Sequence, residues 1–315
     1  MKKGYLLGFI ILCFFIFKYF TFSSNISSSD ELHLMQFNND YNIYSLVKPD
    51  SLNFCGEKVP ISSQDIWERL DLELLRNTYW QSNTMLYFKR ANKFFPIIEP
   101  ILKKNNIPDD FKYLAVIESG LLNVISPAGA TGVWQILKTT GKEYGLEINK
   151  YIDERYHLEK STEAACKYLN EAYARFGNWT LVAASYNMGM NGIQRTIDKQ
   201  ETNNYYNLYL NQETSKYLFR IIAIKEIMQN PIKYGFVFRK KDLYDIPDLK
   251  LVYIDTTIND LYSFSQKIGA NFKIIKKYNP WIREDHVPNS SRRNYIIKLP
   301  DSSSLNIFDN IKKVN

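Results

Sequence analysis

The sequence predicts a mainly α-helical protein with a small α+β unit near its C-terminal end. Between residues 61 and 232, apolar residues recur at helical spacing and are punctuated by Pro and Gly. Beyond residue 249, two short runs, LVYID and YIIKLP, flank two helical stretches. A chain of 315 residues, of which 45% are hydrophobic and 23% charged, has room for one large domain and one smaller domain.

The N-terminal segment predicts a membrane anchor over residues 1–22. Residues 4–17 carry no charge, two lysines precede them, and the apolar character resumes after Lys18, whose charge can reach the membrane surface. Positive residues before such a span place the bulk of the chain outside the cytoplasm. A cleaved signal peptide is the first alternative, and a lipoprotein with Cys13 as its attachment site is the second.

Changes in composition divide the rest of the chain into five parts. Residues 23–60 are rich in Ser, Asn and Asp and are expected to form an extended polar tether. Residues 61–232 are the helical domain, and residues 233–249 are a connector. Residues 250–300 are expected to form a strand-helix-helix-strand unit, followed by a frayed tail at 301–315.

Six helices are expected in the helical domain, because starting and stopping residues bracket each apolar pattern. The first has the apolar face Ile66, Leu70, Leu74 and Leu75, and the second runs from Thr84 to Lys104 with a break at Pro96. The third begins at Asp109 and Asp110, and the fourth runs from Ser161 or Thr162 to Gly177. The fifth starts at Asn178, and the sixth runs from Glu213 to Gln229, where Pro231 ends it.

Charge, cysteines and histidines exclude several classes of function. A net charge of +7 favours an anionic polymer or a membrane surface, but no dense basic block indicates nucleic acid. Three cysteines do not make a disulfide framework; Cys55 and Cys166 are the candidate pair, although the apolar pattern around Cys166 indicates a packed thiol. The three histidines lack the spacing of metal ligands, so neither a metal nor another cofactor is expected.

Glu118 is the candidate catalytic residue. It follows the apolar run LAVI near the end of the third helix. Apolar surroundings raise the pKa of a carboxyl group, which allows it to act as a general acid near neutral pH. The next acidic residue is Glu143, so the following loop supplies no second carboxylate. Taken alone, however, a Glu near a helix end is usually a solvated surface residue.

Three further motifs accompany Glu118 in a fixed order. The loop SPAGATGVWQI is rich in small residues that allow close approach to a ligand, and it ends in an aromatic and an amide side chain. The runs AASYNMGMNG and ETSKYLFRII follow. The motif residues are Glu118-Ser119, Gly132-Val133-Trp134-Gln135, Ser185-Tyr186-Asn187-Met188-Gly189 and Glu213-Thr214-Ser215-Lys216-Tyr217.

This order resembles that of the lytic transglycosylases with a goose-lysozyme-like fold, the bacterial enzymes that cut peptidoglycan strands. The pattern of that family is Glu-Ser, Gly-Leu-Met/Trp-Gln, Ala-Tyr-Asn-x-Gly and Glu-Thr-x-x-Tyr, from which Val133 and Ser185 are small departures. Trp in the second motif is similar to the membrane-bound type D branch. The likeness runs from about Trp67 to Met228 and implies a lysozyme-like SLT helical domain on the periplasmic side of a bacterial envelope.

The resemblance also implies a reaction that needs only one carboxylate. Glu118 would protonate the oxygen between N-acetylmuramic acid and N-acetylglucosamine, while the substrate's acetamido oxygen stabilises the charge at C1. The C6 hydroxyl of the same sugar would then close a 1,6-anhydro ring. Ser119 and Tyr217 are expected to bond the carboxylate or the acetamido group, and Gln135 and Asn187 to hold sugar groups.

The remaining motif residues have two interpretations each. Tyr186 is expected to stack on a sugar face and Trp134 to form an aromatic platform, with a core position as the alternative for both. Glu213 is either a substrate-side residue or a charge at a helix start.

Residues 252–300 resemble a LysM module, a fold that binds N-acetylglucosamine polymers. The usual Gly-Asp-Thr-Leu opening is replaced here by Asp255-Thr256-Thr257-Ile258, so the fold is a firmer expectation than sugar binding. The alternative to glycan targeting is a unit that only packs on the helical domain.

Two other functions stay open. A lysozyme-type hydrolase would need a carboxylate that activates water, for which Asp153, Glu154 and Glu163 are the candidates. A wall-binding scaffold would keep the fold and the cleft but not the turnover. The expected partners are peptidoglycan strands and, through the N-terminal segment, a membrane; the sequence names no protein partner.

Overall fold

The computed structural model describes residues 30–32, 35–36 and 44–301. Contacts between Cα atoms divide the chain into residues 1–45 and residues 46–315, and every element below belongs to the second unit. The predicted anchor at residues 1–22 lies outside the described residues. Within the described part of the chain, no helix is both long and apolar enough to cross a membrane.

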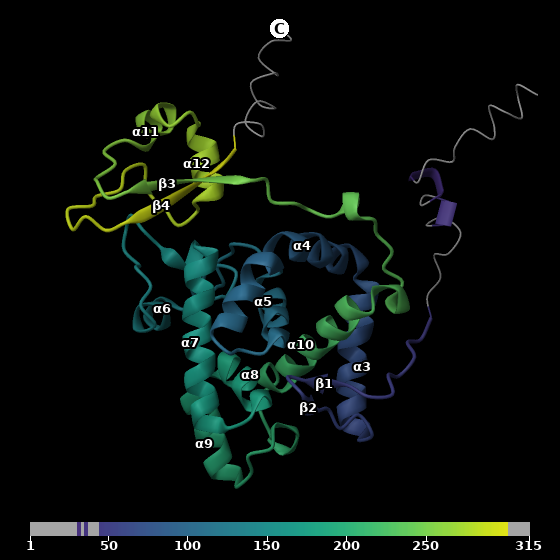
Figure 1. Ribbon diagram of the computed structural model, residues 1–315. Helices are drawn as coiled ribbons and strands as arrows, with labels where there is room; N and C mark the ends of the chain where they lie inside the picture. The colour runs from purple at the N-terminus through teal and green to yellow at the C-terminus, as the bar shows by residue number, and fades with distance from the viewer. Residues whose placement is uncertain (1–29, 33–34, 37–43, 302–315) are drawn as a thin grey trace, which may run out of the picture. The chain divides into compact units, whose positions relative to one another are not determined.

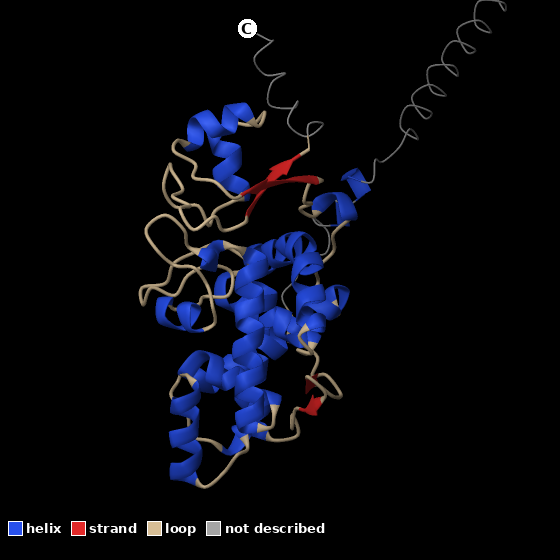
Figure 2. Ribbon diagram, turned by 60° about the vertical axis from the view of Figure 1, so that its left-hand side comes forward, coloured by secondary structure: helices blue, strands red, loops and turns tan. Residues whose placement is uncertain are grey.

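Eight α-helices of the second unit make up the helical domain (Figures 1 and 2). Six of them correspond to the helices expected from the apolar periodicity, whereas the helices at Lys138–Glu143 and Met190–Gln200 were not expected. They are α3 (Gln64–Tyr79), α4 (Gln81–Lys104), α5 (Lys112–Ser119), α6 (Lys138–Glu143), α7 (Leu158–Phe176), α8 (Trp179–Met188), α9 (Met190–Gln200) and α10 (Thr214–Gln229). The central helix is α10, which packs on α3, α5 and α8. Because α10 buries residues on most of its sides, it holds α5, and therefore Glu118, against the core.

Two predicted helix boundaries are wrong. The break at Pro96 does not occur, because α4 continues from Gln81 to Lys104 with two prolines inside it. Burial of Phe88 and Ile98 on one face of α4 offsets the backbone hydrogen bond that Pro96 removes. The fourth helix begins at Leu158, before the predicted Ser161 or Thr162, because both hydroxyls bond back to Leu158 O inside the helix.

The last part of the predicted tether is folded. Within residues 23–60, the strands β1 (Asn53–Phe54) and β2 (Glu57–Lys58) pair antiparallel, and Phe54 is fully buried. The Asp110 carboxylate accepts from Cys55 N at 2.6 Å and from Lys225 Nζ at 2.7 Å. Composition alone missed this hairpin because its buried residues are few and its polar residues find partners in distant helices.

A second polar contact ties this hairpin to α8. The Glu57 carboxylate accepts from the backbone N–H groups of Trp179 at 2.5 Å and Thr180 at 3.1 Å. The first N–H groups of a helix lack partners within the helix, so a carboxylate there is stabilising. Cys55 and Cys166 are both free thiols, so the candidate disulfide is absent.

The C-terminal module confirms the predicted strand-helix-helix-strand order. It consists of β3 (Leu249–Ile254), α11 (Leu261–Lys267), α12 (Phe272–Tyr278) and β4 (Tyr295–Pro300). The two strands pair antiparallel from Leu249 opposite Pro300 to Ile254 opposite Tyr295 (Figure 1). Buried Asn279 joins the end of α12 to β4 through two hydrogen bonds of 2.8 Å to the backbone of Lys298.

Candidate active site around Glu118

Glu118 lies in the last turn of α5, the short helix held against α10. Residues Tyr113 to Val116 are buried, which fixes the helix, and the chain turns away directly after Ser119. Gly120 makes this turn with a φ of +60°, and a Cβ there would lie 3.0 Å from the Tyr87 ring. The turn leaves the Glu118 side chain at the end of the helix, half-buried, as the sequence predicted.

The Glu118 carboxylate accepts a hydrogen bond from the phenol of Tyr217 on α10. Burial raises the pKa of Glu118 to about 7; the Tyr217 hydrogen bond and the charge of Arg220 oppose this increase, whereas Glu213 adds to it. The pKa of Tyr217 is itself raised well above its usual value, because the phenol is buried beside Glu118. A carboxyl group with a pKa raised in this way can take part in proton transfer near neutral pH.

Ser119 does not contact the carboxylate of its neighbour. Its hydroxyl donates to Val133 O at 2.8 Å, and so ties the end of α5 to the loop that follows. This is a different bond from the one expected from the sequence. It results from the helical geometry, which points successive side chains about 100° apart and turns Ser119 toward the loop.

Trp134 takes the core position, which was one of its two interpretations, and not the position of an aromatic platform. Its side chain is fully buried, and its indole N–H donates to Thr162 Oγ1 at 2.8 Å. Tyr186 packs at the border of the core and donates from its phenol to Trp134 O at 2.8 Å. Burial raises the pKa of Tyr186 well above its usual value, and the Glu118 charge raises it further. Both aromatic side chains therefore fix the loop that contains Trp134 against the core.

Gln135 holds the same loop in shape. Its amide N–H group donates to Gly132 O at 2.8 Å and to Val124 O at 3.0 Å. The backbone of Gln135 has a φ of +48°, a left-handed conformation that these bonds help to stabilise.

Asn187, near the end of α8, lies beside Glu213 at the start of α10. Asn187 accepts from Thr214 Oγ1 at 2.7 Å and donates to Glu213 Oε1 at 3.3 Å. Glu213 is the residue before the first turn of α10, so its carboxylate also lies at the positive end of that helix, as the alternative interpretation held. The structure thus joins the third and fourth motifs, which are 26 residues apart.

Arg220 is a residue of the site that the sequence analysis missed. Its guanidinium donates to Ile117 O at 3.3 Å, one residue before Glu118, and its charge lowers the pKa of Glu118. The available signal was its position three residues after Tyr217, which places both on one face of α10. Arginine is common enough in helices that this spacing alone carried little information.

The candidate carboxylates for a hydrolase are all engaged elsewhere. Asp153 pairs with Arg155 at 2.7 Å, Glu154 pairs with Lys160, and Glu163 pairs with Lys104 at 3.0 Å. The carboxylate whose charge acts on Glu118 is instead Glu213. Among the described residues, no group of three or more His, Cys, Asp or Glu side chains is arranged to hold a metal ion.

Residues 95–209 match the family described as Transglycosylase SLT domain. The chain contains a transglycosylase SLT domain. Glu118, Gln135 and Asn187 lie inside the match, whereas Glu213 and Tyr217 follow it. Residues 250–303 match the family described as Soluble lytic transglycosylase C-terminal LysM-like domain, in agreement with the fold of the C-terminal module.

Two curated relatives of this chain have the same name. The chain is 30% identical over 238 residues to the membrane-bound lytic murein transglycosylase D of Escherichia coli strain K12. The aligned region covers 73% of this chain and 51% of that relative. The protein of the same name from Escherichia coli O6:H1 gives the same values. The chain therefore spans about half the length of the curated relatives it matches.

Proposed function

We propose that this protein is a peptidoglycan lytic transglycosylase that cleaves the β-1,4 bond between N-acetylmuramic acid and N-acetylglucosamine without water. The observation that carries the proposal is the half-buried Glu118, whose pKa is raised to about 7 and whose hydrogen-bond partner is a phenol rather than a cation. Such a carboxyl group can give up a proton and take one back at neutral pH. The SLT domain match and the name of the relatives support the same reaction class.

In the first step, protonated Glu118 donates its proton to the glycosidic oxygen. The bond from that oxygen to C1 of the muramic sugar breaks, and the sugar's own acetamido oxygen bonds to C1 and shares the positive charge. Glu118 is left ionised, and the phenol of Tyr217 stabilises its charge by hydrogen bonding.

In the second step, ionised Glu118 takes the proton of the C6 hydroxyl of the same sugar. The C6 oxygen attacks C1, the bond to the acetamido oxygen breaks, and a 1,6-anhydro ring closes. Glu118 is protonated again and the cycle is complete. Because the nucleophile belongs to the substrate, its effective concentration is high and no second carboxylate is needed to activate water.

The remaining site residues have supporting roles in this proposal. Gln135 and Asn187 contact sugar hydroxyl or amide groups, while Ser119, Trp134 and Tyr186 hold the loop that carries Gln135. Glu213 orients Asn187 and adds a negative charge near Glu118, which helps to keep it protonated.

Mass spectrometry of digested peptidoglycan tests this proposal. We expect products with 1,6-anhydro-muramic ends and none with new reducing ends. Glu118→Gln should reduce cleavage by a factor of about 100 to 10,000 while retaining binding to glycan strands, since a general acid contributes an effect of that order. Reducing ends would identify a lysozyme-type hydrolase, and binding without any products would identify a wall-binding scaffold.

We also propose that the protein works on the periplasmic side of a bacterial envelope, held by residues 1–22 as a membrane anchor. The part of the predicted tether (residues 23–60) that precedes the hairpin at residues 53–58 would then give reach. Residues 61–232, 233–249 and 250–300 would be the helical domain, connector and LysM-like module. The word membrane-bound in the name of the relatives supports this location. The intact mass of the protein extracted from membranes tests it, because a cleaved signal peptide would leave a product without residues 1–22.

A further inference from the structure

The C-terminal module docks on one segment of the helical domain, residues 147–157, which precedes α7. The backbone of Asp153 donates to Trp281 O at 2.9 Å, and Arg283 N donates to Tyr151 O at 2.8 Å. These two bonds flank a β-bridge between Ile152 and Ile282. The segment therefore joins the module as if it were a short extra strand.

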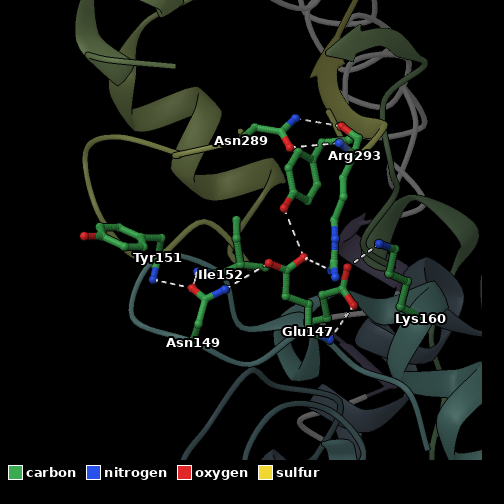
Figure 3. A network of polar contacts seen from close by, with 9 residues as sticks. Glu147, Asn149, Tyr151, Ile152, Lys160, Asn289 and Arg293 are labelled. Carbon is green, nitrogen blue, oxygen red and sulfur yellow. Dashed lines mark hydrogen bonds and ion pairs between the residues drawn. The ribbon is translucent and has the colours of Figure 1, made fainter. Parts of the chain in front are cut away.

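Side chains complete this contact through Glu147 (Figure 3). Its Oε2 accepts from Arg293 at 2.8 Å and from the Tyr295 phenol at 3.0 Å, and its Oε1 accepts from Asn149 at 2.9 Å. The Glu147 side chain is only 17% exposed. A carboxylate removed from water in this way needs donors, and two of its three donors belong to the module.

The apolar part of the contact also joins residues 147–157 to the module. Ile152 and Tyr156 are buried in the hydrophobic cluster of the module rather than in the core of the helical domain. The guanidinium of Arg283 lies 4.0 Å above the centre of the Tyr156 ring. Removing the module would therefore expose apolar surface of the segment as well as its own.

Arg155 connects this docked segment to the loop beside Glu118. It is 8% exposed, and its Nε and Nη2 atoms donate to the two oxygens of Asp153 at 2.9 and 2.7 Å. Its third nitrogen, Nη1, donates to Gly129 O at 3.0 Å and to Ile136 O at 3.2 Å. One buried side chain thus holds both ends of loop 129–136, and Asp153, which aligns it, is bonded to the module.

Loop 129–136 in turn forms the support of the candidate active site. Gly132 has a φ of +84°, and a Cβ there would lie 2.1 Å from Arg155 O, so the loop and the segment touch along their backbones. Val133 O accepts from Ser119, the neighbour of Glu118, at 2.8 Å. Gln135, the residue expected to contact glycan, lies on the same loop.

We propose that Arg155 is a positioning residue for the reaction, and that docking of the C-terminal module on residues 147–157 holds Arg155, and through it loop 129–136, in the working arrangement. The module then acts on turnover and not only on glycan binding. Three successive hydrogen-bonded contacts make up this path. They join Trp281 of the module to Asp153, Asp153 to Arg155, and Arg155 to loop 129–136. This inference rests on the proposed function for its catalytic readout, whereas its structural part does not.

Two variants of the full chain test this proposal: one changes Arg155 itself, and the other weakens the docking of the module through Glu147. Arg155→Lys keeps the positive charge but loses the planar fork that bonds Asp153 and the loop together. We expect kcat on soluble, uncrosslinked glycan strands to fall about tenfold with KM within about twofold. Hydrogen exchange of the amides in residues 129–136 should become faster.

The second variant, Arg293→Ala with Tyr295→Phe, removes both hydrogen-bond donors that the module gives to Glu147. Neither residue contacts loop 129–136 directly. We expect kcat to fall about threefold and exchange to increase in residues 147–157 and in residues 129–136. Combining the two variants should reduce kcat by less than the product of their separate effects, because both act on the order of the same loop, residues 129–136.

Lys104→Ala is the matched control. It removes an ion pair with Glu163 whose side chains are 74% and 34% exposed and which joins α4 to α7 away from this path. It should leave kcat and the exchange of residues 129–136 unchanged.

Faster exchange in residues 147–157 with unchanged exchange in 129–136 and unchanged kcat would overturn the proposal, since the module would then only pack on the domain. An equal fall in kcat for the control would also overturn it, because the effect would be general. If wild-type protein yields no anhydro products, the proposed function fails while the exchange measurement still decides whether the module orders the loop.

Discussion

Two half-buried glutamates of the same unit, Glu118 and Glu159, have pKa values on opposite sides of the ordinary value. Burial raises the pKa of Glu118 to about 7, and its main polar partner is the phenol of Tyr217. Burial also acts on Glu159, but His157 and Lys298 outweigh it and lower its pKa to about 2. Lys298 belongs to the C-terminal module and pairs with Glu159 in the first turn of α7.

The comparison teaches that burial alone does not set the state of a carboxyl group; the charge of its partner does. A phenol can stabilise a carboxylate without holding it ionised, whereas an ammonium group favours the ionised form strongly. Glu118 can therefore exchange a proton at neutral pH, and Glu159 serves as a fixed negative charge that binds the module. Each of the following changes alters one partner or one carboxyl group of this pair.

Removing the phenol should have the largest effect. Tyr217→Phe takes away the hydrogen bond that lowers the pKa of Glu118, so this pKa should rise above about 7 and the alkaline limb of activity should move to higher pH. Turnover should also fall about tenfold, because the ionised form of Glu118 loses a donor during the reaction. A pH profile of kcat measures both, and an alkaline limb that moved to lower pH would contradict the assignment.

Neutralising Glu118 should make the protein more stable at alkaline pH. The folded pKa of about 7 lies above the unfolded value of 4.5, so the folded state binds more protons between these values and wild-type stability falls as pH rises. Glu118→Gln removes this loss and should raise the free energy of unfolding by roughly 1 to 3 kcal/mol at pH 8. Urea unfolding at pH 8 and pH 4 measures it, and at pH 4 the gain should nearly vanish.

Neutralising Glu159 should have the opposite sign and a smaller size. Its folded pKa of about 2 lies below the unfolded value of 4.5, so its contribution is complete above that value and is lost as pH falls through about 2. Because the side chain is 33% exposed, Glu159→Gln should lower the free energy of unfolding at pH 7 by only about 1 kcal/mol. The same urea experiment measures this change, and an increase in stability at pH 7 would show that the pair with Lys298 is not favourable.

The helical domain, the module and the position of Glu118 could be predicted because each depends on residues that are close together in the sequence. The spacing of apolar residues within α10, the strands flanking two helices in the module, and the apolar run before Glu118 all depend on neighbours in the chain. The resemblance of the motifs, rather than any one local pattern, pointed to Tyr217, which the structure places against Glu118. Local patterns could not decide between a platform and a core position for Trp134, because an aromatic residue after a glycine-rich loop occurs in both settings.

What the sequence determined by itself is therefore the class of fold, the order of the four motifs and the choice of Glu118 as the candidate acid. Only the tertiary structure decided which partner each carboxyl group has. Glu118 meets a phenol 99 residues away, and Glu159 meets an ammonium group 139 residues away. The hairpin at residues 53–58 and the docking of the module on Arg155's segment belong to the same category, because their contacts join parts of the chain whose separation no local pattern records.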